Sequence, residues 1–312
     1  MNKLILSLFA LPCLCLGQAF PNKPINYLVP FPAGGESDIV ARWQQETFAK
    51  KFPPHNMVVV NKVGAGGGLA WSQMNREPID GSSVTGVNLP HIVLQPMEGN
   101  VQYKTEDVTP VYFFHYTPDA IVVPANSPFK TLQDLLTAAR AKPGDIAFGG
   151  SALNGANHAA HARFEDMSKI KTVYVPFKGT ADMTSSLLGG HLHASMTYIT
   201  FAISNKEKTR VLAIATEKRH PLFPDVPTFK ELGYSWADGA YRGVGVAKGT
   251  PEAVRKQVSE VFRTLNADPD YKRRNVNGGF ELVDIGYEQM PAFMAERSKA
   301  YQADAKRLGL LK

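Results

Sequence analysis

Cysteine is scarce in this chain of 312 residues, which has only two. So few cysteines exclude a disulfide scaffold. The sequence also lacks low-complexity tracts and repeats of solenoid period, which excludes a disordered protein and a repeat protein. The excess of positive over negative charge is also small. The formal net charge is +6 and is spread along the chain, so we expect no nucleic-acid partner.

The remaining composition is that of an ordinary soluble globular protein. Hydrophobic residues make up 44% of the chain and charged residues 20%. The length favours two compact domains over one. After the first 19 residues, no apolar run approaches the roughly 20 residues that a membrane-spanning helix needs.

The first 19 residues have the pattern of a secretion signal. A positive charge at Lys3 precedes an apolar run over residues 4–16. The small residues Gly17 and Ala19 follow, at the positions that signal peptidase reads if it cuts after Ala19. The apolar run is too short to span a bilayer. We therefore predict a signal peptide over residues 1–19 and a mature protein in the periplasm.

Both cysteines, Cys13 and Cys15, lie inside this predicted signal peptide. A lipoprotein anchor is the alternative, but it needs a small residue before the cysteine. Cys13 follows a proline and Cys15 a leucine, so we favour the cleaved signal. The exported protein would then contain no thiol and no disulfide, and its stability would come from its hydrophobic cores.

After residue 19, short apolar runs typical of strands alternate with amphipathic stretches typical of helices. The predicted strands are residues 25–31, 57–60, 83–87, 146–148, 173–175, 192–196, 211–215 and 244–247. The predicted helices are residues 37–51, 68–76, 132–141, 157–167, 181–188, 252–265 and 290–307. This order is typical of parallel sheets covered by helices.

A long apolar stretch, residues 108–123, separates two rounds of this alternation and is predicted to connect two domains. We therefore predict an α/β protein of two lobes with a cleft between them. Each lobe would be a mainly parallel sheet flanked by helices. The predicted first lobe is residues 20–124 together with 239–312, and the second lobe is residues 125–238.

Three loops between a predicted strand and the following helix are rich in small residues: 31–38, 149–158 and 176–181. Ligands of open parallel sheets bind in such loops. Glycines let backbone amides approach a bound group, and a helix N-terminus favours an anion. Each loop alone can equally be a tight turn, but three of them in both halves favour a carboxylate site.

Other motifs do not fit their patterns. Residues 64–68 resemble a dinucleotide fingerprint, but Leu69 stands at the last glycine position. A serine hydrolase elbow at Ser151 fails because Leu153 replaces the required glycine. His158 and His161 lack a third metal ligand. We therefore predict no cofactor, no metal and no catalytic residue.

Several runs together resemble the Bug-type solute receptors of tripartite tricarboxylate transporters. Residues 24–31, 33–35, 38 and 41–42 resemble the first motif of that family, and residues 58–61 with 64–67 are similar to its second. Further landmarks follow in the expected order at residues 80–81, 175–179, 187–190 and 223–228. The likeness covers essentially the whole chain after residue 19.

The resemblance implies a periplasmic binding protein fold, the Venus flytrap, whose two lobes close over a small organic anion. Backbone and hydroxyl groups of the loops after the first and fourth strands hold the ligand's carboxylate in such receptors. The ligand-binding residues that the resemblance implies are Phe31, Ala33, Gly34, Gly35, Asp38, Asn88, His91, Ser151, Asn154, Asn157, His158, Phe177, Thr180 and Ala181.

The sequence departs from this family after Gly190, where many members carry acidic residues. Here His193, Thr197 and Tyr198 occupy those places. An acid there can pair with the ammonium group of a ligand, and without one the buried cation would be unpaired. We therefore predict a carboxylate without an amine, either a di- or tricarboxylate or an aromatic acid that contacts Phe31, Phe177 and Tyr198. The alternative is that the aromatic residues only pack the hinge.

The resemblance further implies a monomer that delivers its ligand to membrane permease subunits. A receptor that presents its closed form to a membrane sensor kinase is the alternative, and the sequence does not separate the two. A periplasmic hydrolase is a third hypothesis, which predicts turnover of candidate esters.

Overall fold

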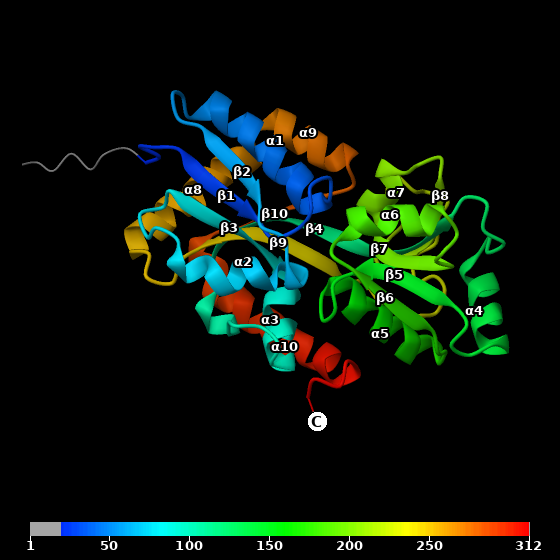
Figure 1. Ribbon diagram of the computed structural model, residues 1–312. Helices are drawn as coiled ribbons and strands as arrows, with labels where there is room; N and C mark the ends of the chain where they lie inside the picture. The colour runs from blue at the N-terminus through cyan, green and yellow to red at the C-terminus, as the bar shows by residue number, and fades with distance from the viewer. Residues whose placement is uncertain (1–19, 312) are drawn as a thin grey trace, which may run out of the picture.

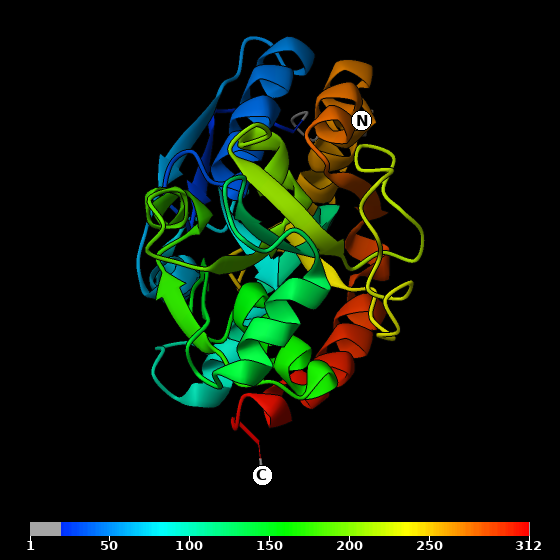
Figure 2. The same ribbon diagram turned by 90° about the vertical axis from the view of Figure 1, so that its right-hand side faces the viewer.

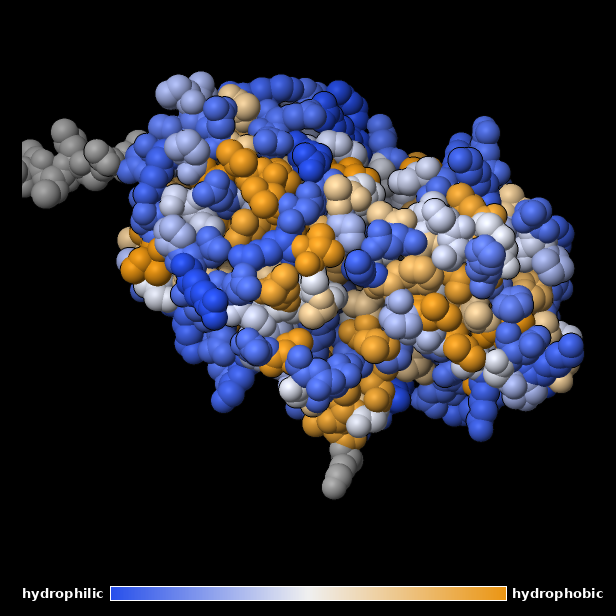
Figure 3. All heavy atoms as spheres, viewed as in Figure 1, coloured by the Kyte–Doolittle hydropathy of each residue, from blue (hydrophilic) through white to orange (hydrophobic). Residues whose placement is uncertain are grey.

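The computed structural model describes residues 20–311, which form two lobes side by side (Figure 1). The predicted signal peptide lies outside these residues. Within residues 20–311, no helix combines the length and the apolar composition that crossing a membrane requires. Hydrophilic side chains dominate the face of the molecule shown in Figure 3, with apolar ones interspersed among them.

The first lobe is a sheet with helices on both faces. Its strands are β1 (Ile25–Val29), β2 (Met57–Asn61), β3 (Ser83–Leu89), the first part of β4 (Thr109–Pro124), β9 (Gly239–Val246) and β10 (Glu281–Ile285). The strand order is β2-β1-β3-β9-β4, and β10 also pairs with β4. β1 runs parallel to β2 and β3, whereas β9 lies antiparallel between β3 and β4.

Helices from both ends of the chain cover this sheet. They are α1 (Glu36–Lys51), α2 (Gly68–Gln73), α3 (His91–Glu98), α8 (Glu252–Ala267), α9 (Pro269–Asn277) and α10 (Met290–Arg307). One core packs α1, α8 and α9 on the sheet around Phe48 and Phe262. A second core, around Trp71 and Leu94, packs α2, α3 and α10. The last segment of the chain therefore completes the lobe that the first segment begins.

The second lobe repeats the arrangement on a smaller sheet. Its strands are the second part of β4, β5 (Ala147–Ser151), β6 (Val173–Phe177), β7 (Ala194–Tyr198) and β8 (Thr209–Ile214). Its helices are α4 (Leu132–Ala141), α5 (Ala156–Ser168), α6 (Thr180–Leu188) and α7 (Ile199–Ser204). The cores pack α4 and α5 on one face, and α6 and α7 on the other. Short 3₁₀ turns lie at Ala65–Gly67, Met74–Arg76, Thr105–Asp107 and Tyr287–Gln289.

β4 belongs to both lobes. Its residues 109–118 pair with β9, and its residues 119–124 pair with β7 and β8. Side chains alternate between the two faces of a strand. Accordingly, Ile121 and Val123 enter the core beneath α4 and α5, while Ala120 and Val122 enter the core beneath α6 and α7. Burial on both faces explains the long, mostly apolar stretch in the sequence.

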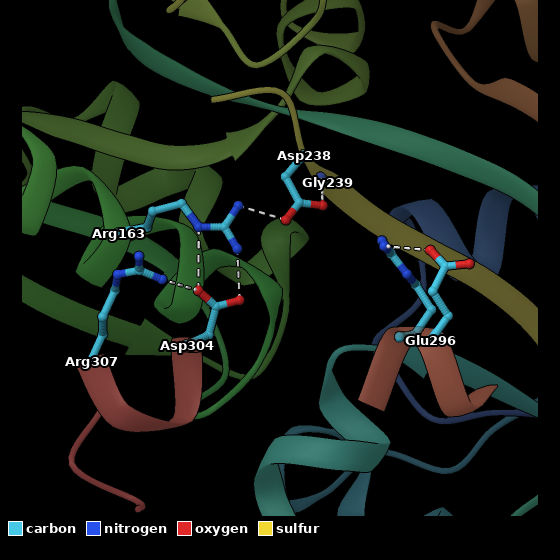
Figure 4. Close-up of polar contacts among 7 residues, drawn as sticks. Arg163, Asp238, Gly239, Glu296, Asp304 and Arg307 are labelled. Carbon is cyan, nitrogen blue, oxygen red and sulfur yellow. Dashed lines mark hydrogen bonds and ion pairs between the residues drawn. The ribbon is translucent and has the colours of Figure 1, made fainter. Parts of the chain in front are cut away.

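The lobes also meet through the C-terminal helix. α10 packs against α5 of the second lobe (Figure 2). Arg163 of α5 lies between two carboxylates there, with Nη2 2.7 Å from Asp304 Oδ2 and Nη1 2.5 Å from Asp238 Oδ2 (Figure 4). Arg307 extends the cluster by donating to Asp304 and Asp166. We call these five residues the α5–α10 ion-pair cluster.

The predicted α/β class and two-lobed fold are confirmed, but the sheet is mixed. Within residues 20–311, four strand pairings are parallel and five are antiparallel, because β9, β8, β7 and β10 all run opposite to a neighbour. The sequence analysis missed α3, α7, α9 and β10, and it predicted a connection between domains where the structure has the strand β4. α3 contains Pro96 and α9 is almost entirely polar, so neither shows a helical apolar period.

Candidate functional site

The described residues line a narrow, partly open cavity of about 20 Å³ between the lobes. It lies where β1, β3, β5 and β7 end, the edge at which parallel sheets bind ligands. We call it the interlobe cavity. Its lining residues are Phe31, Pro32, Gly35, Glu36, Ser37, Asn88, His91 and Arg242 from the first lobe, and Ser151, Gly179, Thr180, Ala181 and Tyr198 from the second.

The loop between β1 and α1 is held in shape by Asp38. Its Oδ2 accepts hydrogen bonds from the backbone N of Gly34 at 2.9 Å and from Arg42 Nε at 3.0 Å, and its Oδ1 accepts from Asn61. Burial opposes ionisation of this carboxyl, but these hydrogen bonds outweigh it and lower the pKa of Asp38. Gly34 has a φ of +80°, a conformation that favours glycine. Asp38 therefore positions the loop and does not line the cavity.

Ser151, at the end of β5, is oriented by Asn157 of α5. The side-chain oxygen of Asn157 accepts from Ser151 N at 3.0 Å and from Ser151 Oγ at 2.7 Å. The hydroxyl proton of Ser151 is thus directed at an amide oxygen, which is not a general base. The Nδ2 group of Asn157 is buried and has no partner among the described residues.

Arg242 of β9 is the cation of the cavity. Its side chain is 5% exposed, and its guanidinium lies 4.8 Å from the centre of the Tyr198 ring. One Nη donates to Thr117 of β4. Its Nε is buried without a hydrogen-bond partner among residues 20–311. A buried guanidinium with a free donor is costly to maintain unless a ligand or water completes it.

His91, at the start of α3, closes another side of the cavity. Both of its ring nitrogens are buried and lack a partner in the described part of the chain. Burial, together with the positive charge of Arg242, lowers the pKa of His91 to about 3, so the ring is neutral at pH 7. A Cβ added at Gly155 would lie 2.6 Å from His91 Nε2, so only glycine allows the lobes to approach this closely here.

Glu36 is the anion of the cavity and bridges the two lobes. It is the first residue of α1, and its Oε2 accepts a hydrogen bond from Thr180 Oγ1, at the start of α6, at 2.5 Å. Its Oε1 lies 3.3 Å from Thr200 Oγ1, and Arg242 Nη2 lies 3.9 Å from Oε2. Glu36 and Arg242 are thus the charged residues among those that line the cavity.

The structure brings together eight of the residues implied by the sequence: Phe31, Gly35, Asn88, His91, Ser151, Thr180, Ala181 and Tyr198. Seven others do not line the interlobe cavity: Ala33, Gly34, Asp38, Asn154, Asn157, His158 and Phe177. Asp38 and Asn157 lie behind it, as described above. Ala33 and Gly34 are exposed.

The remaining three of these seven have other contacts. Asn154 Nδ2 donates to Glu98 of the first lobe at 2.5 Å, and its backbone N donates to His158 Nδ1. The His158 ring stacks on Tyr174, and burial lowers its pKa to about 4. Phe177 packs in the core beneath α6 and α7.

Sequence reasoning missed Glu36 and Arg242. Glu36 lies inside the first small-residue loop, where the glycines alone predict the carboxylate site. Arg242 stands in the run Gly239–Val246, where every other residue is small, apolar or aromatic. A lone arginine within a buried strand was the signal that could have found it.

Known proteins resemble this chain over most of its length. The tripartite tricarboxylate transporter family receptor matches residues 40–310. A Cupriavidus necator protein described as "UPF0065 protein in gbd 5'region" is 29% identical over 98% of this chain and 94% of its own length. The structure of the periplasmic binding protein BugD is 25% identical, with a TM-score of 0.85 over 93% of this chain and 99% of that one.

A structure of an R. palustris protein with adipate has a TM-score of 0.85 over 93% of this chain and 98% of its own, at 23% identity, which shows a common fold. Both structures have the same architecture as this chain. The chain therefore belongs to the tripartite tricarboxylate transporter family of receptors, which bind solutes and are not enzymes.

Proposed function

We propose that this protein is a periplasmic receptor that captures a small organic carboxylate in the interlobe cavity and delivers it to the membrane permease of a tripartite tricarboxylate transporter. The observation that carries the proposal is the buried Arg242, whose Nε faces no acceptor among the described residues. A ligand carboxylate would supply the missing acceptor. It would also pair a desolvated positive charge, whose burial is otherwise unfavourable.

Neutral donors surround this cation. Ser37, Ser151 and Thr180 line the same cavity. The hydroxyls of Ser151 and Thr180 donate to Asn157 and Glu36 here and would turn to the ligand on binding. Hydrogen bonds to a charged group contribute about 1.5–3 kcal/mol each. A few of them, with apolar contact to Phe31 and Tyr198, reach the roughly 8 kcal/mol of micromolar binding after the cost of association. We assign ligand contact to the eight implied residues that line the cavity and to Arg242.

Lobe closure follows from the same arrangement. The cavity takes its walls from both lobes, so a ligand that contacts both favours the closed state. We place the boundary between the lobes inside β4, near residues 118–119, and between residues 238 and 239. The first boundary is six residues earlier than residue 124, the last residue of the first lobe expected from the sequence. Closure would then bend the chain at these two crossings between the lobes.

We also propose that the protein acts in the periplasm. Two structural neighbours are described as a periplasmic transporter and a periplasmic binding protein, which supports export directed by residues 1–19. The closed form would present a surface to permease subunits, and we propose that the receptor acts as a monomer.

The expectation of a ligand without an amine needs revision. It assumed that no acid lies in the cleft, because the positions after Gly190 carry none. Glu36 lines the cavity, so this premise is wrong, and the proposal is restricted to the carboxylate itself.

A thermal-shift screen tests the proposal, because a ligand that binds only the folded state raises its melting temperature. Mono- and dicarboxylates, aromatic acids and amino acids would be compared with the matching uncharged amides. We expect at least one carboxylate to raise the melting temperature and its amide to have no effect. An equal rise with the amide, or no rise with any acid, would contradict the proposal.

A further inference from the structure

Glu36 occupies a position that is built to hold an anion. Its carboxylate, on the first residue of α1, reaches the first residue of α6 and accepts from the hydroxyls of Thr180 and Thr200. Arg242 Nη2 lies 3.9 Å from it. The N-termini of both helices add positive potential at the same point. Hydroxyls, a guanidinium and two helix ends are the groups that would otherwise hold a carboxylate of the ligand.

A second observation shows that polar capacity is left for a ligand beside Glu36. Arg242 Nε and both nitrogens of His91 are buried, line the same cavity and have no partner among the described residues. These residues are 4% and 2% exposed. The cavity therefore has one anion position, held by Glu36, and beside it buried polar atoms that no described residue pairs.

The charges of the lining residues lead to the same conclusion. Glu36 contributes −1 and Arg242 +1, so the lining is neutral overall. A monocarboxylate adds one negative charge, which Arg242 can pair. A dicarboxylate adds a second negative charge close to Glu36, where like charges repel and little water screens them.

We propose that Glu36 takes the place of a second ligand carboxylate, so that this receptor selects monocarboxylates over dicarboxylates of the same carbon skeleton. The inference rests on the proposed function and names the substrate class of the same cavity. Its physical basis is the contact of Glu36 with Thr180, Thr200 and Arg242, in a cavity with a single buried cation among its lining residues.

Calorimetry with matched ligand pairs tests this. The probes are butanoate and succinate, hexanoate and adipate, and 4-methylbenzoate and terephthalate. We expect the wild-type protein to bind one of the monocarboxylates at least tenfold more tightly than its dicarboxylate partner. In Glu36→Gln, which keeps the side-chain shape and removes the charge, we expect that ratio to fall at least tenfold through a gain in dicarboxylate affinity.

Glu98→Gln is the matched control. Glu98 also bridges the lobes, through Asn154, and the substitution removes the same charge. Glu98 lines a separate cavity beside Ala152 and Phe177 and not the interlobe cavity. We expect this variant to keep the wild-type ratio between mono- and dicarboxylate.

Three results would overturn the inference while leaving the proposed function intact. In the first, the wild-type protein binds dicarboxylates as tightly as monocarboxylates. In the second, Glu98→Gln gains as much dicarboxylate affinity as Glu36→Gln. In the third, Glu36→Gln keeps the wild-type ratio of monocarboxylate to dicarboxylate affinity. A wild-type preference for 6-aminohexanoate over hexanoate that Glu36→Gln abolishes would also overturn it, because Glu36 would then pair with an ammonium group. If no carboxylate binds to either protein, the proposed function itself fails.

Discussion

Two of the contacts between the lobes treat buried polar groups in opposite ways. In the α5–α10 ion-pair cluster, Arg163 donates from Nε, Nη1 and Nη2 to the carboxylates of Asp304 and Asp238 (Figure 4). In the interlobe cavity, the Arg242 side chain is only 5% exposed, against 16% for Arg163, but it leaves its Nε without an acceptor among the described residues. A satisfied buried charge indicates a structural joint, whereas an unsatisfied one beside a cavity indicates a place for a ligand.

Breaking the ion-pair cluster tests the structural side of this comparison and should have the largest effect. Arg163→Gln would leave Asp304, which is 1% exposed, without its main partner. Removing one partner of a buried ion pair costs about 3–5 kcal/mol. We expect a loss of this size in the free energy of unfolding, measured with urea.

Arg219→Gln is the control for this variant, because Arg219 pairs with Glu231 at the surface, where both side chains are 45% exposed. Exposed pairs contribute about 0–1 kcal/mol. Equal losses in the two variants would contradict a structural role for the α5–α10 ion-pair cluster.

Arg242→Gln tests the ligand side of the comparison. The variant removes the cation and its free Nε donor from the cavity, so the carboxylate loses one or two charge-assisted hydrogen bonds. At about 1.5–3 kcal/mol each, the affinity should fall at least tenfold. We expect calorimetry to show this loss, while the unfolding free energy changes less than in Arg163→Gln. If Arg242→Gln lost stability but kept its carboxylate affinity, Arg242 would have a structural role and not a ligand-binding one.

Asp119 lies where β4 passes from one lobe to the other and offers a pH-dependent test. Its carboxyl faces Asp238, Arg163, Asp304 and Arg242, and burial followed by the charge of Asp238 raises its pKa well above the usual value. In the unfolded chain the pKa is about 3.9. The folded state thus holds this proton more tightly, so the stability gained from it is complete below about pH 3.9 and is lost as the pH rises through the folded value.

Asp119→Asn cannot ionise and should avoid this loss. We expect the melting temperature of the variant relative to wild type to be higher at pH 8 than at pH 4. Scanning calorimetry at pH 4, 6 and 8 measures the difference. A constant difference across this range would mean that Asp119 does not hold a proton at the lobe crossing.

The order of strands and helices could be predicted because apolar periodicity reports local burial. The predicted helix 132–141 coincides with α4, whose Leu132, Leu135 and Leu136 face the core. The direction of β9 was not predictable in this way. A strand buried on both faces has the same apolar pattern in either direction, and only the return of the chain across β3 and β4 makes it antiparallel.

The sequence predicts the loops of the candidate site but not its charged residues. The strand-to-helix loops bring Gly35, Ser151 and Thr180 to one cavity, because the ends of parallel strands meet at one edge of a sheet. Arg242 comes from β9, 91 residues after Ser151, and no local pattern links the two. Asn157 and Asp38 support the loops through hydrogen bonds that depend on side-chain direction, which sequence spacing does not fix.

The smallest expected effect concerns a neutral donor at the cavity. Ser151→Ala removes a hydroxyl that lines the cavity but keeps the backbone hydrogen bond to Asn157. The net value of one hydrogen bond is about 1 kcal/mol, so carboxylate affinity should fall only a few-fold. Calorimetry beside Ser185→Ala, at an exposed position of α6, measures this loss. The Ser151 hydroxyl points at Asn157, so an unchanged affinity would show that it keeps this partner when the ligand binds. The difference between the paired charges of the α5–α10 ion-pair cluster and the unpaired polar groups of the interlobe cavity would then depend on Arg242 and His91 alone.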